Sequence, residues 1–127
     1  MSTRPPSSFS LKNGLTLLCV DQSKKIAADR WYICVKIDVT IPVEKKWFDN
    51  NLLDDEQFRQ IKGSLGEAVV FQQKKERHFV SDDNKALIVK EIWDNAVEMG
   101  MKYLSRDDFA AKFILKVFAD QQKRQHK

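Results

Sequence analysis

The clearest pattern in the chain is an alternation of side chains between positions 31 and 41. Each odd position in this stretch is a β-branched or aromatic residue, and most even positions are polar. A period of two residues places the two sets on opposite faces of an extended chain, so we predict a strand with one buried face over residues 31–41. Pro42 ends the pattern because it has no N–H for a sheet hydrogen bond.

Two other stretches are predicted to be strands. Residues 15–20 are largely apolar and follow the turn-forming pair Asn13-Gly14, which indicates a short buried strand. Residues 67–80 contain no Gly, Asn or Asp that would form a hairpin turn, so one long strand is favoured over two short ones. The charged middle of this strand is typical of an exposed sheet edge. Residues 21–29 are expected to be a polar connector.

The first predicted helix begins after Asp54. The Asp54 side chain can cap the helix N-terminus, and Gln57, three residues later, supplies the other half of a capping box. Either Gly63 or Gly66 can end the helix in a left-handed conformation. The sequence therefore predicts a short helix of two turns or slightly more.

The C-terminal third of the chain is predicted to be helical. Residues 84–104 carry a wide apolar stripe opposite a charged face, as in an amphipathic helix. Ser105 is expected to cap a final helix, with Asp108 completing a variant of the capping box. From Gln121 onward the apolar pattern is lost, which indicates a polar tail.

This order of elements predicts an α+β fold. Strands come first and helices follow, so we expect an antiparallel sheet of three to four strands packed on one face by the two C-terminal helices. The 127 residues fit a single domain. We assign residues 1–10 to a flexible leader rich in Ser and Pro, residues 11–120 to the domain, and residues 121–127 to a basic polar tail.

Composition and charge add little to this picture. The formal net charge is +4, and the basic surplus lies in residues 1–46 and 106–127. The two cysteines are too few for a disulfide framework. No secretory segment and no apolar run of membrane-spanning length is visible, so we expect a cytoplasmic protein with no membrane association.

The sequence shows no convincing catalytic constellation. Cys34 needs a nearby base to act as a nucleophile, and His78 is the one histidine outside the tail. The spacing of His78, Asp82 and Asp83 matches no metal motif, and a glycine-rich phosphate loop is absent. We therefore expect a protein that is not an enzyme and that holds no cofactor or metal; a hydrolase or redox role for Cys34 or His78 is the weakest alternative.

Two sets of residues are candidates for binding. The first is a surface for another protein, made of aromatic and thiol side chains: Tyr32, Cys34, Trp47 and Phe48. The second is a set of basic residues that can contact an anion or a nucleic acid: Lys24, Lys25, Arg30, Lys123, Arg124 and Lys127. For Arg30 a structural role is favoured, in which the neighbouring Asp29 carboxylate pairs with its guanidinium. Binding to another protein is the preferred hypothesis, and association with nucleic acid is the alternative.

Five short stretches together resemble a small family of uncharacterised bacterial proteins. They are residues 11–17 (LKNGLTL), 28–31 (ADRW), 41–43 (IPV), 103–105 (YLS) and 109–113 (FAAKF). These motifs are structural, and they contain no recognised catalytic or ligand-binding residue. The resemblance therefore implies a bacterial origin, and no activity, cofactor or catalytic residue comes with it.

Overall fold

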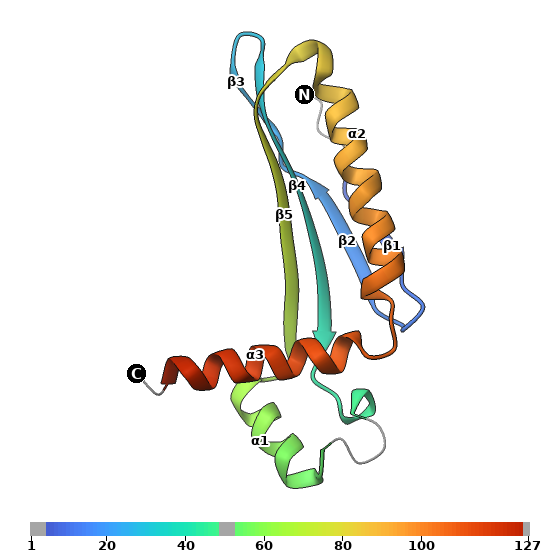
Figure 1. Cartoon of the computed structure of the whole chain (residues 1–127), viewed down its shortest axis with the longest axis vertical. Coiled ribbons are helices and arrows are strands. Elements are labelled where there is room, and N and C mark those ends of the chain that lie inside the picture. Colours follow the sequence, from blue (N-terminus) through green and yellow to red (C-terminus); the bar gives the residue numbers. More distant parts are fainter. Residues whose placement is uncertain (1–4, 49–52, 126–127) are drawn as a thin grey trace.

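The computed structural model describes residues 5–48 and 53–125, and it shows an α+β fold. An elongated antiparallel sheet is packed by the C-terminal helices, with one long helix beside the sheet and another crossing its lower end (Figure 1). The predicted fold class is confirmed, although the sheet has five strands within these residues where three or four were expected.

The sheet is organised around one long central strand. Its strands are β1 (Ser7–Ser10), β2 (Thr16–Asp21), β3 (Lys24–Ala27), β4 (Arg30–Pro42) and β5 (Ala68–Ser81). One edge of β4 pairs with β2 and, farther up, with β3, and the outer edge of β2 pairs with β1. The other edge of β4 pairs with β5 along almost its whole length, from Arg30 opposite Ser81 to Pro42 opposite Ala68.

Among the residues described, three α-helices and two short helical turns complete the fold. They are a 3-10 turn (Lys45–Trp47), α1 (Asp55–Leu65), α2 (Asp82–Met99), a π-helical turn (Gly100–Leu104) and α3 (Phe109–Gln125). Because α2 follows β5 without a loop, the chain reverses at the top of the molecule and α2 runs back along the sheet (Figure 1). Helix α3 then crosses the lower ends of β4 and β5, with α1 beneath it.

The hydrophobic core lies between α2 and one face of the sheet, which we call the inner face. The odd-numbered residues of β4 from Ile33 to Ile41 point to this face and are at most 2% exposed. Val89, Ile92, Trp93 and Ala96 of α2 pack against them. This arrangement confirms the alternation read from the sequence, with the β-branched side chains on the buried face.

Two strands lie where the sequence analysis expected none. Ser7–Ser10, assigned to a flexible leader, form β1, in which Phe9 turns toward the core between exposed serines. Within the expected connector, Lys24–Ala27 form β3. All four residues of β3 are exposed, so its strand conformation comes from backbone pairing with β4 and leaves no hydrophobic pattern in the sequence.

The C-terminal prediction is wrong in two details. Ser105 does not cap the last helix, because its hydroxyl donates to the Met101 carbonyl at 2.6 Å and closes the preceding helical turn; α3 begins at Phe109. The expected polar tail is helical as far as Gln125, and the Gln121 side chain bonds to Ser64 of α1. Residues 126–127 lie outside the described part.

The other local signals are confirmed. Asp54 accepts from the Gln57 N–H at 2.8 Å, and the Gln57 side chain accepts from the Asp54 N–H at 3.0 Å, so the capping box is complete. Gly66 ends α1 with a φ of 86°, whereas Gly63 lies within the helix. Residues 68–81 form one strand, at the edge of the sheet.

Candidate binding groove

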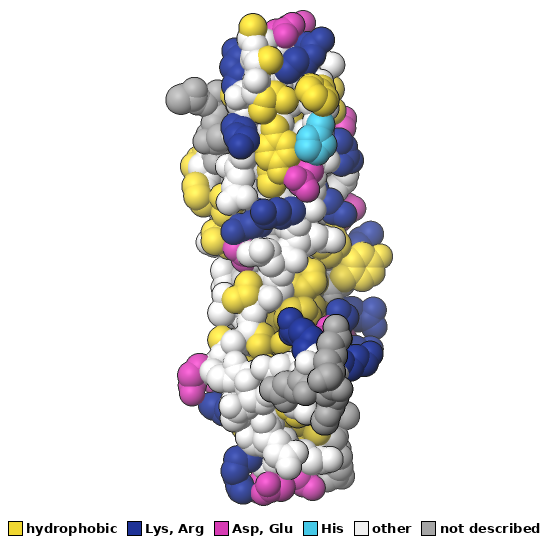
Figure 2. Space-filling model, turned by 90° about the vertical axis from the view of Figure 1, so that its left-hand side faces the viewer, with side chains coloured by type: hydrophobic (Ala, Val, Ile, Leu, Met, Phe, Trp, Pro, Cys, Tyr) yellow, Lys and Arg dark blue, Asp and Glu magenta, His cyan; other side chains and the backbone are white. Residues whose placement is uncertain are grey.

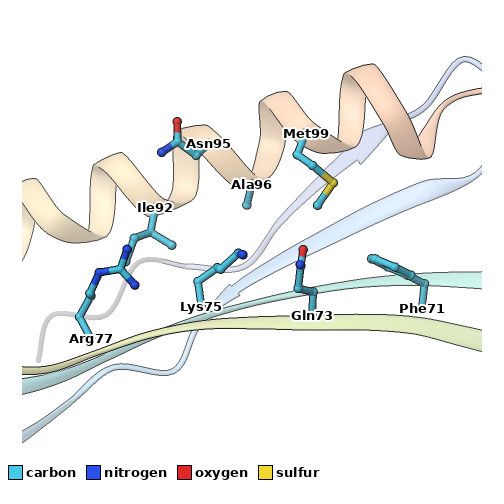
Figure 3. Close-up of a pocket in the computed structure, with 8 residues that line it drawn as sticks. All are labelled: Phe71, Gln73, Lys75, Arg77, Ile92, Asn95, Ala96 and Met99. Carbon is cyan, nitrogen blue, oxygen red and sulfur yellow. The ribbon is translucent and has the colours of Figure 1, made fainter.

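A groove runs along the inner face of β5, beside α2. Its volume is about 420 Å³, and it is lined by alternate residues of β5 and by one side of α2: Phe71, Gln73, Lys75, Arg77, Ile92, Asn95, Ala96 and Met99. In Figure 3 the four β5 side chains point toward the helix, and Ile92, Ala96 and Met99 point back toward the strand. The six residue steps from Phe71 to Arg77 make it about 20 Å long.

The groove exists because α2 lies over β4 and β2 and leaves β5 partly uncovered. At its lower end α2 passes into the π-helical turn, where Gly100 approaches β2 so closely that a Cβ atom there would lie 2.2 Å from Leu17 Cδ1. The helix therefore diverges from β5 on its way down from their shared junction (Figure 1). In the part of the chain that is described, no other helix or strand fills the space between them.

The lower end of the groove is closed by three phenylalanines. Phe71 of β5 meets Phe109 and Phe113 of α3 edge to face, with ring centroids 5.6 and 5.5 Å apart. Such aromatic pairs add about 0.5–1.5 kcal/mol to the burial of their surfaces. The groove consequently has an apolar lower end formed by two elements, β5 and α3, that are distant in sequence.

The upper end of the groove is basic. Lys75 and Arg77 are exposed, and neither takes part in any ion pair between described residues. The Arg77 guanidinium donates to the Glu76 carbonyl at 2.8 Å, which still leaves several of its five N–H donors available. Between the two ends lies Gln73, whose Oε1 is buried and accepts no hydrogen bond from the residues described. The groove thus changes from apolar to polar to cationic along its length.

The outer edge of β5 borders this groove. Among the described strands β5 pairs with β4 alone, so its other edge presents backbone N–H and C=O groups that no strand satisfies. Six consecutive residues from Lys74 to Phe79 are exposed, which means that both faces of the strand are uncovered here. In Figure 2, which faces this side of the molecule, Lys and Arg side chains cross the middle of the surface between hydrophobic ones.

The predicted aromatic and thiol surface is not a single surface. Cys34 is 2% exposed; its backbone N–H donates to Ser23 Oγ at 3.1 Å and its thiol lies 3.9 Å from Gln22 Oε1. Tyr32 is half-buried, and its hydroxyl donates to a carboxylate oxygen of Glu76. This bond, followed by a smaller contribution from Cys34, raises the pKa of Tyr32 above its ordinary value of 10.0.

Phe48 also lies in the interior. It is 3% exposed and contacts the Phe58 ring with centroids 6.1 Å apart. Trp47 is half-buried, and its indole N–H donates to the Pro42 carbonyl at 2.8 Å. Cys34 and Phe48 are therefore both buried, and the prediction that they form an exposed surface is wrong. Cys34 lies on the outer face of β4, where Gln22 and Ser23 cover it, and Phe48 packs into the core. Tyr32 and Trp47 are far apart, at opposite ends of β4.

The basic candidates fall into two groups at opposite ends of the molecule. Lys24 and Lys25 of β3 and Arg30 at the start of β4 lie at the top, and the end of α3 lies at the bottom (Figure 1). Lys25 pairs with Asp82 at 3.6 Å. Arg30 lies 3.3 Å from Asp29 Oδ2, which agrees with the structural role favoured from the sequence. Lys25 and Arg30 thus each face a carboxylate of this chain, whereas Lys24 Nζ lies over the Tyr32 ring, 5.9 Å from its centroid.

The second basic group is exposed. Lys123 and Arg124 lie in the last turn of α3, where cations stabilise the helix C-terminus. Lys127 lies outside the described residues. These side chains and Lys24 and Lys25 lie at opposite ends of the molecule, so within the described residues the two predicted groups do not form one continuous basic surface.

Cys34 and His78, the candidates for a hydrolase or redox role, lie near Glu76 and Tyr32. Cys34 lies opposite Glu76 in the β4–β5 pairing, and the His78 ring packs on Tyr32 with centroids 5.3 Å apart. Within residues 5–48 and 53–125, no three His, Cys, Asp or Glu side chains gather as a metal site would require. Asp82 accepts from the Trp31 indole N–H at 2.5 Å in addition to its pairing with Lys25. Of the described helices, none has the length and apolar character needed to cross a membrane.

Sequence reasoning identified the strand but missed the groove. Lys75 and Arg77 were recognised only as edge charges, although they share the inner face with Phe71. The signal was present in the alternation: of the inner-face positions 71, 73, 75 and 77, only the first is apolar. The inner face of β5 changes from apolar to polar along the strand, and α2 leaves the polar part uncovered.

Comparisons with known proteins do not assign the chain to a family. No family model, no curated protein and no solved structure matches it. The resemblance to uncharacterised bacterial proteins stays a prediction.

Proposed function

We propose that this chain is a small non-enzymatic protein that binds a segment of another protein in the groove between α2 and β5. The observation that carries the proposal is the juxtaposition of an unpaired strand edge with an open groove. Its basic side chains, Lys75 and Arg77, have no acidic partner among the residues described. Each feature alone is common on protein surfaces, and together they form one continuous binding surface.

The dimensions of the groove support a chain segment as its occupant. A volume of about 420 Å³ falls within the range of specific ligand sites, and the groove is long and open on one side. Extended peptides are commonly held by an exposed strand edge beside pockets for alternate side chains. The β5 edge supplies the backbone groups and the groove supplies the pockets.

A second copy of this chain fits the edge poorly. If two β5 edges paired antiparallel about a two-fold axis at Lys75, the two Lys75 side chains would face each other, and an axis at Lys74 would place the two Lys74 side chains opposite each other. Like charges directly opposite each other destabilise a strand pair. Charge therefore favours a different protein as the partner over self-association.

A bacterial cytoplasm is part of the proposal. Cys19 and Cys34 are both buried and form no disulfide, which supports a reducing compartment. The bacterial origin rests on the sequence resemblance.

The test is a selection of random peptides on the immobilised protein, followed by NMR mapping of the selected peptides on the ¹⁵N-labelled chain. We expect chemical-shift changes in β5 and in the side of α2 that faces it, centred on Gln73 and Ala96. The control is the outer face of the sheet, where Thr16 and Thr40 should not respond.

Two results would contradict the proposal. One is that no peptide is enriched over an unrelated protein of similar charge; the other is that shift changes cluster away from the groove. A parallel titration with duplex DNA tests the alternative function. Salt-sensitive shifts at Lys123 and Arg124, together with an unresponsive groove, would favour nucleic-acid association.

A further inference from the structure

We infer that the bound segment adds to β5 as a further antiparallel strand, and that it carries acidic side chains opposite Arg77 and Lys75 and an apolar side chain opposite Phe71. This inference rests on the proposed function, because it specifies the chemistry of the segment that the groove binds. It follows from the register of β5, the order of residues along the groove and the charges left without partners.

The first step is the geometry of strand addition. A strand beside β5 lies about 4.8 Å from it, and its side chains alternate between the two faces of the sheet. Phe71, Gln73, Lys75 and Arg77 all lie opposite inward-facing residues of β4, so they share the inner face. The inward side chains of an added strand would lie beside these four residues and over the open side of the groove.

The second step is the spacing. Inward positions on the added strand recur about every 6.8 Å, the same interval that separates Lys75 from Arg77 on β5. Two acidic side chains separated by one residue can therefore face the two cations at once. Opposite charges on directly facing residues stabilise a strand pair, and both cations lie outside the ion pairs of the described chain.

The lower end of the groove determines which side chain can bind opposite Phe71. Phe71, Ala96 and Met99 form an apolar lower end that the rings of α3 close. An apolar side chain from the segment would bury its surface there, which favours binding. Between the ends, Gln73 has an oxygen without a donor, which suits a small polar side chain.

The direction of the added strand fixes the order of these residues. Antiparallel pairing is the more stable of the two arrangements, and every strand pair in the described sheet is antiparallel. An antiparallel segment meets Arg77 first and Phe71 last. Read from its N-terminus, it therefore has the order acidic, any, acidic, any, polar, any, apolar.

The experiment measures binding of synthetic peptides to the full chain by fluorescence polarisation at about 0.15 M salt, where exposed charges act over about 8 Å. The probe is a peptide of about seven residues with Glu at the two acidic positions, Asn at the polar one, Leu at the apolar one and Thr between them. One comparison peptide has Gln in place of both Glu residues, and another has the same residues in reverse order.

Charge reversal on the protein provides the matched control. The double variant Lys75→Glu, Arg77→Glu should bind the acidic probe about tenfold more weakly than the parent chain does. It should bind a probe with Lys at the acidic positions more tightly. Lys74→Glu reverses one charge on the outer face of the same strand and is the matched control for Lys75→Glu alone; it should alter binding by less than about threefold. All three residues are exposed, so these variants should fold.

Strand addition has its own signature. N-methylation of the peptide amides that face β5 should abolish binding, whereas N-methylation of the alternate, outward amides should not. Binding should also slow hydrogen exchange of β5 amides whose N–H groups point outward in the free protein.

The outcomes separate the two levels of the argument. If the Gln peptide binds in the groove as tightly as the Glu probe, or if the reversed peptide binds better, the inferred chemistry or direction is wrong while the proposed function stands. If neither these peptides nor peptides from the random selection bind in the groove, the proposed function fails. Preference for the acidic probe together with its reversal in the charge-reversed variant supports the inference.

Discussion

Two glycines at the end of α1 allow one chemical change to be tested in two backbone environments. Gly63 is helical and exposed, and a Cβ added there meets nothing within 4 Å. Gly66 is also exposed and has the same open space around it, but its φ and ψ are 86° and −154°. The space around the two positions is the same, so backbone conformation alone distinguishes them.

The two alanine substitutions should therefore have opposite signs. Gly63→Ala removes conformational freedom from the unfolded chain and should raise the free energy of unfolding by about 0.4–1 kcal/mol. Gly66→Ala forces a side chain into a region that is almost exclusive to glycine and should lower it by about 1–3 kcal/mol. The two variants should differ by about 1.5–4 kcal/mol, the sum of the two effects.

The assay is urea unfolding followed by circular dichroism and by fluorescence of the three tryptophans. With a slope of about 1.5 kcal/mol per M, the midpoints of the two variants should lie about 1 M or more apart, on opposite sides of the parent chain. Equal slopes for the variants and the parent chain would show that unfolding exposes the same surface area in each of them. If both substitutions shift the midpoint in the same direction, the assignment of Gly66 as the residue that ends α1 is wrong.

Three further substitutions test contacts elsewhere in the fold. Gly100→Ala places a methyl group against Leu17 and should lower the free energy of unfolding by about 1–3 kcal/mol. In a double-mutant cycle with Leu17→Ala, measured by urea unfolding, the loss in the double variant should be smaller than the sum of the two single losses by about 1 kcal/mol or more. Asp54→Ala removes one half of the capping box and should cost about 1 kcal/mol, measured in the same way. Lys112→Met should raise the pKa of Asp108 in an NMR titration, because the Lys112 ammonium, 3.0 Å away, holds that pKa below its ordinary value of 3.8.

Each of these predictions has a result that contradicts it. Additive losses in the cycle would mean that Gly100 and Leu17 are not in contact. If Asp54→Ala leaves the urea midpoint unchanged, the Asp54 cap does not stabilise the fold. For Asp108 the folded pKa is depressed, so its ionised form stabilises the fold above the unfolded pKa and this contribution is lost as the pH falls through the folded value. A titration of Asp108 that is identical with and without Lys112 would refute the assigned cause.

Local patterns in the sequence were sufficient wherever the structure depends on local interactions. The alternation over residues 31–41 corresponds to the buried face of β4, and the pairing of Asp54 with Gln57 depends on residues three positions apart. The long, charged edge strand was also predictable, because residues 67–80 lack any turn residue.

The missed elements depend on partners that are distant in sequence. β3 has four exposed residues and is a strand because β4 lies beside it, which no periodicity within residues 24–27 could reveal. The Ser105 side chain can cap a helix, but its hydroxyl donates instead to the Met101 carbonyl in the preceding π-helical turn. A local signal shows what a residue can do, and its tertiary neighbours decide which interaction it makes.

The candidate site shows the same division. The exposed, basic character of β5 could be read from the sequence, whereas the groove depends on the angle at which α2 crosses the sheet. At the lower end of α2, Gly100 approaches Leu17 of β2 closely, and these two residues are far apart in sequence. The burial of Cys34 and Phe48 likewise required the packed fold, since both are residue types that occur on surfaces and in cores.

The most direct test of the groove as a binding site is the measurement of intermolecular NOEs between the acidic probe peptide and protein labelled at its methyl groups and phenylalanine rings. The account predicts NOEs from the apolar peptide side chain to the Met99 methyl group and to the Phe71 ring. NOEs to Leu18 or Val70, which are exposed away from the groove, would place the peptide elsewhere. That result would contradict the assignment of function to the space between α2 and β5.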